Sequence, residues 1–184
     1  MNASESVRGR LLVAAPGMLD PNFVRSVLLV LEHTAEGALG VILDRPSEVP
    51  VDAVLERWAD VVSPPPVFFS GGPVAPEGMI ALVRGPDADA TGWVPLFDGL
   101  GSIDLAGAPA DAPSLDRLRV FAGHAGWAPG QLDAELAQGG WLVVDAEAAD
   151  PFTTDPSGLW RAVLERQSGR LSWYANAPVD PSTN

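Results

Sequence analysis

The sequence contains no cysteine and no lysine, and each absence excludes a class of chemistry. Without cysteine, the chain cannot form disulfides, thiolate nucleophiles, zinc fingers or iron–sulfur clusters. Without lysine, it cannot form a Schiff base or use the lysine of a phosphate-binding P-loop. A chain without cysteine is compatible with the cytoplasm, and no motif in it predicts a bound cofactor.

Positive charge is scarce. The chain has 11 basic residues, all arginine, against 24 acidic ones, so its formal net charge is −13. The arginines form no run, and the closest pairs are Arg8/Arg10 and Arg117/Arg119. DNA binding depends largely on neutralising phosphates, and a chain this acidic is repelled by them at long range. The composition therefore disfavours direct nucleic-acid binding.

Long apolar runs are missing as well. No stretch reaches the roughly 20 apolar residues of a membrane-spanning helix, and the purest aliphatic run covers only residues 27–31. The apolar segment 11–15 is shorter than the ~7–15 residues of a signal-peptide core. The sequence therefore predicts a cytoplasmic protein that does not enter a membrane.

The length of 184 residues and the 47% hydrophobic content suit one globular domain. Short apolar runs separated by turn residues predict an α+β fold, because strands and helices alternate too unevenly for a regular βαβ repeat. We expect the domain to span residues 9–176, with flexible ends at 1–8 and 177–184. Strands are expected at 11–16, 26–33, 39–44, 67–73, 79–84, 93–97, 102–105, 118–123, 139–145 and 171–175, and helices at 51–58, 130–138 and from 155 to 169.

The two histidines are the first candidates for chemistry. His33 ends a predicted strand beside Glu32 and could act as a general base with a carboxylate, or it could simply bond the backbone at a turn. His124 lies in a glycine-rich segment without a serine, threonine or carboxylate close by. Two histidines without cysteine, and without H-x-x-x-H spacing, predict no metal site.

Two glycine segments raise further possibilities. The stretch Ser70-Gly71-Gly72-Pro73 partly imitates a nucleophile elbow but lacks its G-x-S-x-G pattern, so a turn is the simpler interpretation. The stretch from Gly123 to Gly130 predicts a glycine corner between a strand and a helix. Trp127 in this corner could cover a pocket or pack into the core.

Four stretches, in this order, resemble the YqgE/AlgH family of bacterial proteins. They are "GRLLVAAPGMLDPNFVRSVLLVLEHTAEGALGVILDRP", "FSGGPV", "GHAGWAPGQLDAELAQGGWLVVDA" and "DPSGLWRAVL", and together they span about residues 9–170. The resemblance implies a single α+β domain with a bifurcated mixed β-sheet that contains a small closed β-barrel surrounded by helices. It also implies a bacterial cytosolic protein. Members are often labelled transcriptional regulators, although no helix-turn-helix is evident here.

The chain departs from the family pattern at two positions. Asp44 stands where members usually have Asn, and His124 stands where an aromatic residue, usually Tyr, is common. The second departure argues against a shared imidazole base at His124.

We therefore predict a non-enzymatic cytosolic binding or regulatory protein with an unknown small molecule or protein as its partner. A small hydrolase that uses His33 with a carboxylate is one alternative, and a transcriptional regulator is another. The candidate ligand or partner site consists of turn residues at strand ends, namely His33, Asp44, Arg45, Gly71, Gly72, Pro73, Gly123, His124, Trp127 and Gln131.

Overall fold

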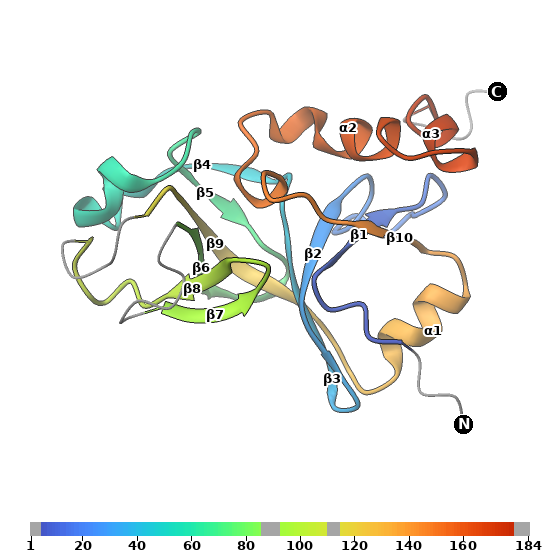
Figure 1. Cartoon of the computed structure of the whole chain (residues 1–184), viewed down its shortest axis with the longest axis horizontal. Helices are drawn as coiled ribbons and strands as arrows, with labels where there is room; N and C mark the ends of the chain where they lie inside the picture. The colour runs from blue at the N-terminus through green and yellow to red at the C-terminus, as the bar shows by residue number, and fades with distance from the viewer. Residues whose placement is uncertain (1–4, 86–92, 110–114, 179–184) are drawn as a thin grey trace.

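The computed structural model describes residues 5–85, 93–109 and 115–178 (Figure 1). Within these ranges a ten-stranded sheet dominates, and short helices lie against it. The strands are β1 Arg10–Ala14, β2 Val27–Thr34, β3 Gly37–Ile42, β4 Pro46–Pro50, β5 Val67–Ser70, β6 Val74–Arg84, β7 Trp93–Phe97, β8 Leu100–Ile103, β9 Arg117–Trp127 and β10 Trp141–Asp145. The α-helices are α1 Gln131–Ala137, α2 Leu159–Glu165 and α3 Arg170–Tyr174, and the 3₁₀ helices are η1 Val51–Ala53, η2 Glu56–Val61, η4 Asp150–Phe152 and η5 Pro156–Gly158.

The sheet forks at β9, the strand that both halves of the molecule share. Strands pair in the order β10-β1-β2-β3-β9-β6-β8-β7. The first half of β9 also pairs in parallel with β5, where Phe69 lies opposite Phe121, whereas its last residues pair antiparallel with β3. Figure 1 shows β9 running from the half that holds β5 to β8 into the half that holds β1 to β3.

The half of the molecule that holds β4 to β8 curls into a half-barrel. The resemblance implied a closed barrel, and the pairings between the described strands do not close it. In these pairings β7 bonds only to β8, and β4 bonds only to β5. The expected α+β domain is therefore present as a mixed, bifurcated and partly curled sheet with helices packed around it.

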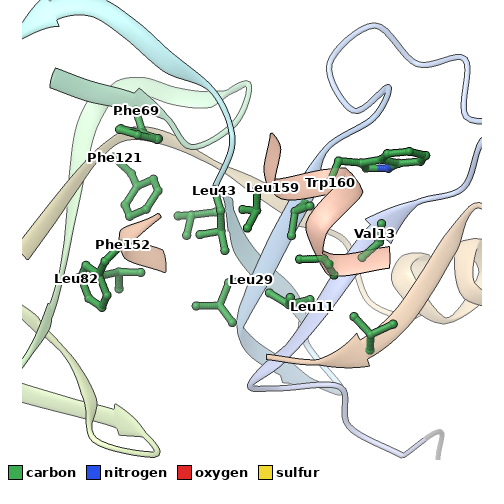
Figure 2. Close-up of a cluster of buried hydrophobic side chains, with 14 of the residues drawn as sticks. Leu11, Val13, Leu29, Leu43, Phe69, Leu82, Phe121, Phe152, Leu159 and Trp160 are labelled. Carbon is green, nitrogen blue, oxygen red and sulfur yellow. The ribbon is translucent and has the colours of Figure 1, made fainter. Parts of the chain in front are cut away.

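Three clusters of buried side chains fill the spaces between these layers. The main core joins the inner faces of both halves to α2, and Figure 2 shows Leu29, Leu82 and Phe152 among its members. A second cluster lies between the sheet and α1 and contains Trp127 and Trp141. A third, around Trp58, joins η1 and η2 to the strands β5, β6, β7 and β9. No helix within the described ranges is long and apolar enough to cross a membrane.

Two predictions for the glycine and C-terminal segments were wrong. The strand expected to stop at Gly123 continues to Trp127, because neighbouring strands bond to it on both sides of that glycine. The strand expected at 171–175 is the helix α3. Leu171 and Tyr174, three residues apart, both pack on the main core, which is the spacing of a helix and not of a strand.

Smaller differences occur elsewhere. The helix expected at 51–58 is divided into η1 and the start of η2. The strand β4 at Pro46–Pro50 was not predicted. The strand expected at 102–105 begins two residues earlier, as β8. The expected flexible ends fall partly outside the described ranges, at residues 1–4 and 179–184. Val7 and Arg8, just before β1, contact β2.

Candidate functional site

The predicted site residues do not gather in one place. His33, Trp127 and Gln131 lie around α1, at one end of the shared strand. Gly71–Pro73, Gly123 and His124 meet at the fork of the sheet. Asp44 and Arg45 follow β3 next to the fork, where the Arg45 carbonyl accepts a hydrogen bond from the Ser70 N–H at 2.8 Å.

His33 is paired with a carboxylate, as one alternative required, but both ring nitrogens face partners within the protein. The Val7 N–H donates to Nδ1 at 3.2 Å. In a neutral ring this places the proton on Nε2, which faces Asp133 Oδ1 at 3.7 Å. The His33 side chain is only 7% exposed. Each nitrogen thus faces a group of the protein itself, a geometry that favours a structural role for this histidine.

Trp127 and Gln131 belong to a hydrogen-bond network centred on Glu135 of α1. Glu135 Oε2 accepts from the indole N–H groups of Trp127 and Trp141, both at 2.9 Å. Glu135 Oε1 accepts from the Gln131 side-chain amide at 3.0 Å. Since buried indole N–H groups need acceptors, this single carboxylate ties α1 to the ends of β9 and β10. These residues join α1 to the sheet.

The glycine landmarks mark a crossing of two backbones at the fork. The chain at Gly71 and Gly72 passes directly over Gly123 and His124 of β9. A Cβ on Gly71 would lie 2.3 Å from the Gly123 carbonyl oxygen, and one on Gly72 would lie 2.2 Å from the His124 carbonyl carbon. Gly123 also has a φ of +71°. The glycines are required because no side chain fits between the two strands.

Asp44 and Arg45 form a partly buried polar pair. Asp44 Oδ1 accepts from the Val27 N–H at 3.2 Å, and its Oδ2 lies 3.4 Å from Arg45 Nη1. Arg45 Nη2 also donates to the Val24 carbonyl. Burial raises the pKa of Asp44 from 3.8 to about 6, although Arg45 and the Val27 N–H oppose the shift. The pair closes the loop between β1 and β2 onto the end of β3.

A site that the sequence did not predict lies at the opposite end of β9. A pocket of about 490 Å³ separates the ends of β6 and β9 from the chain around η4. We call it the arginine pocket, and its lining residues are Arg84, Arg117, Ala148, Ala149, Asp150, Phe152, Thr153, Thr154 and Leu159. Arg84 and Arg117 lie directly opposite each other on the antiparallel strands β6 and β9.

The charge of the arginine pocket is positive within the described residues. Asp150 is the one carboxylate among the lining residues, and Arg166 binds both of its oxygens at 2.8 and 2.7 Å. These hydrogen bonds raise the pKa of Arg166 above its ordinary value. Because Arg166 neutralises Asp150, the charges of Arg84 and Arg117 are not balanced by the pocket wall itself.

A third arginine lies beneath the pocket. Arg119 shares the face of Arg117 on β9, is fully buried, and donates to the carbonyl of the lining residue Thr153 at 3.0 Å. Its guanidinium lies 4.1 Å from the ring centre of Phe69, a cation–π contact. Burial lowers the pKa of Arg119 to about 10, so the group remains charged at neutral pH.

Comparison with known proteins shows to which family the chain belongs. The AlgH-like family model matches residues 11–172. The chain is 45% identical to the UPF0301 protein SCO2948 of Streptomyces coelicolor over 190 residues, which cover 100% of this chain and 98% of that protein. A UPF0301 protein of Thermobifida fusca is 47% identical over 190 residues, covering 97% and 96%. The chain belongs to the AlgH family.

Solved structures of AlgH family proteins share the fold. Protein DIP2367 from Corynebacterium diphtheriae superposes with a TM-score of 0.85 at 34% identity, covering 96% of this chain and 95% of that one. The AlgH protein from Pseudomonas aeruginosa gives a TM-score of 0.69 at 27% identity, covering 97% of each chain. These matches confirm the family resemblance noted from the sequence.

In this AlgH family chain, two of the stretches on which the resemblance rests form contacts between elements of the fold. The "FSGGPV" stretch and Gly123 form the crossing, and Trp127, Gln131 and Glu135 form the network at α1. The sequence does not indicate the arginine pocket, because Arg84 and Arg117 are far apart along the chain. The spacing Arg117-x-Arg119 was the available signal, but the predicted strand began at 118; in β9, which begins at Arg117, this spacing places two cations on one face.

Proposed function

We propose that this protein is a non-enzymatic cytosolic binding protein of a regulatory kind, and that its small-molecule ligand occupies the arginine pocket. The observation that supports this most directly is the pair Arg84 and Arg117, held face to face across β6 and β9 at the wall of one concave pocket. The volume of about 490 Å³ lies in the range of small-molecule sites.

The state of the candidate catalytic groups supports binding over catalysis. His33 directs one nitrogen at a backbone N–H and the other at Asp133. A general base needs a nitrogen within reach of the proton that it removes from the substrate. His33 lacks one, and so the hydrolase alternative has no acceptor for that proton at this residue.

The position of the pocket supports a regulatory role. Arg84 and Arg117 belong to the half-barrel, whereas residues 148–154 and Leu159 belong to the chain that leads from β10 into α2. A ligand in the pocket would contact both parts at once. Such a ligand stabilises the arrangement in which the two parts are close, so its concentration can control a surface built from both.

The proposal is tested by recovering the protein from bacterial cytosol and weighing it intact by native mass spectrometry. Three forms are compared, namely the wild type, Ala149→Trp, which fills the pocket from its rim, and Ala53→Trp, a matched change at an exposed position in η1. We expect the wild type and Ala53→Trp to carry a small molecule and Ala149→Trp to lack it. Equal retention by all three, or retention by none, would contradict the proposal.

A further inference from the structure

We infer that the ligand of the arginine pocket carries a compact dianionic phosphate group, bound by Arg84 and Arg117, together with an apolar body. This inference rests on the proposed function and names the class of ligand. It follows from how charge, hydrogen-bond donors and apolar surface are distributed around the pocket.

Arg84 and Arg117 place two positive charges opposite each other. Residues directly opposite each other on antiparallel strands have Cβ atoms about 4.5–5.5 Å apart, and like charges in such positions repel. Arg84 and Arg117 occupy such positions. Their exposure is unequal, since Arg84 is half-buried and Arg117 is exposed. A dianion between the two guanidinium groups would replace their repulsion with two attractions.

Arg84 and Arg119 have buried N–H donors without acceptors among the described residues. Arg84 Nη1 donates to the Asp98 carbonyl at 2.7 Å, whereas its buried Nε has no partner among the described residues. In the same part of the structure, the Nε and Nη1 of Arg119 also lack partners. Buried guanidinium N–H groups without acceptors are costly. An anion with several oxygens supplies acceptors to Arg84 directly and adds negative charge above Arg119.

The charge of the acidic residue in the pocket wall, Asp150, is neutralised by Arg166. Asp150 would repel an anion, but Arg166 holds both of its oxygens, and the Glu147 N–H donates to Oδ2 at 2.7 Å. Thr153 and Thr154 line the same region. The wall beside the arginines is therefore polar and balanced.

The remaining lining defines the rest of the ligand. Phe152, Leu159 and two alanines, Ala148 and Ala149, complete the pocket. Phe152 and Leu159 belong to the main core, as Figure 2 shows, so the apolar wall is held rigidly. A ligand with an aliphatic or aromatic body would cover this wall while its anionic group contacts the arginines.

Phosphate fits this arrangement better than a single carboxylate. A phosphate monoester carries a charge of about −1.5 to −2 at neutral pH and three acceptor oxygens. Two arginine forks can share its three oxygens, with one oxygen accepting from both, whereas one carboxylate serves one fork. The pairing of two arginines therefore favours a phosphomonoester over a monocarboxylate.

Isothermal titration calorimetry tests this inference on the purified full-length protein. The probes are inorganic phosphate, phenyl phosphate and succinate, a dicarboxylate of similar charge. We expect phenyl phosphate to bind more tightly than phosphate, because of its ring, and more tightly than succinate. Arg117→Gln should weaken the binding of phenyl phosphate about tenfold or more. Arg57→Gln, which removes the same charge from an exposed position in η2, should change it less than about twofold.

The outcomes separate this inference from the proposed function. Since Arg117 is exposed, Arg117→Gln should fold, and Arg84→Gln gives a second reading of the same wall. Failure of phenyl phosphate to bind the wild type, or unchanged binding by both folded variants, would overturn the inference, as would tighter binding of succinate. If native mass spectrometry still finds a phosphate-free molecule that Ala149→Trp excludes, the proposed function stands and only the ligand class is wrong.

Discussion

Asp44 shows how one buried carboxylate links stability to pH. Burial raises its pKa from 3.8 to about 6, because the buried side chain loses the water that stabilises its charge. The folded protein thus holds this proton more tightly than the unfolded chain does. The stabilising contribution of the protonated group is complete below about pH 3.8 and is lost as the pH rises through about 6.

We predict that Asp44→Asn stabilises the protein at pH 7.5. The amide oxygen can still accept from the Val27 N–H, and no charge is buried. A shift of this size corresponds to about 2–3 kcal/mol in the free energy of unfolding at pH 7.5, and the gain should vanish near pH 4. Urea unfolding from pH 4 to pH 8 measures the difference between variant and wild type.

Asp145→Asn is the control, because Asp145 pairs with Arg10 at 2.9 Å but is 89% exposed. Its effect should be small and should lack the rise between pH 4 and pH 6.5. A gain from Asp44→Asn that is the same at pH 4 and pH 8 would contradict the assignment.

The sequence identified Asp44 and Arg45 as notable but could not show their burial. Asp44 follows β3, and its carboxylate is buried where it accepts a hydrogen bond from Val27, the first residue of β2. The same limit applied to the arginine pocket, whose two walls come from separate strands and from η4. Individual residues were thus recognised, whereas their environments depended on contacts distant in sequence.

At the scale of elements, the glycine crossing permits a matched comparison. Gly123 and Gly139 have nearly the same backbone angle, with φ of +71° and +76°. A Cβ on Gly139 would meet nothing within 4 Å, whereas one on Gly123 would lie 2.5 Å from the Gly72 carbonyl oxygen. Substitution by alanine therefore introduces the same backbone strain at both positions and a steric clash at only one.

We predict that Gly139→Ala lowers the free energy of unfolding by about 1–2 kcal/mol, the strain of a left-handed residue. Gly123→Ala should lower it by more than about 4 kcal/mol or prevent folding, because backbone atoms of Gly72 and Val74 cannot move aside independently. Urea unfolding followed by tryptophan fluorescence, together with the yield of folded protein, measures both. Equal losses would show that the strands are not in close contact there.

Elements were predictable where the apolar pattern was continuous. The runs that form β1 and β2 are buried along most of their length and that of β3 along half of it, and the sequence located all three. The continuation of β9 past Gly123 was not predictable, since glycine also marks turns and it is pairing with β3 and with Val74 of β6 that keeps the segment extended. The helix α3 was missed because "LSWYA" has the composition of a strand, while its packing on the main core is helical.

At the scale of the whole molecule, the net charge of −13 and the positive pocket respond oppositely to salt. Repulsion among excess acidic groups destabilises the folded state, and salt screens it. Salt also screens the attraction between an anion and the arginines.

We predict that raising sodium chloride from about 0.05 to about 0.5 M increases the melting temperature by about 2–5 °C and weakens the binding of phenyl phosphate several-fold. Differential scanning calorimetry and titration calorimetry measure the two effects on the same sample. Arg117→Gln should show the same increase in melting temperature, since screening acts on the whole surface. Salt-independent affinity in the wild type would be inconsistent with a phosphate held by charge.

The position of β9 also determines how the molecule comes apart. Residues of β9 belong to all three clusters of buried side chains. Phe121 lies in the main core, and Ala125 and Trp127 lie in the cluster at α1. Leu118 and Val120 lie in the cluster around Trp58. Detaching this one strand exposes all three clusters to water together, so neither half can keep its core buried while the other unfolds. The two halves that share β9 should therefore not unfold independently, and unfolding should be a single cooperative transition despite the forked shape of the sheet.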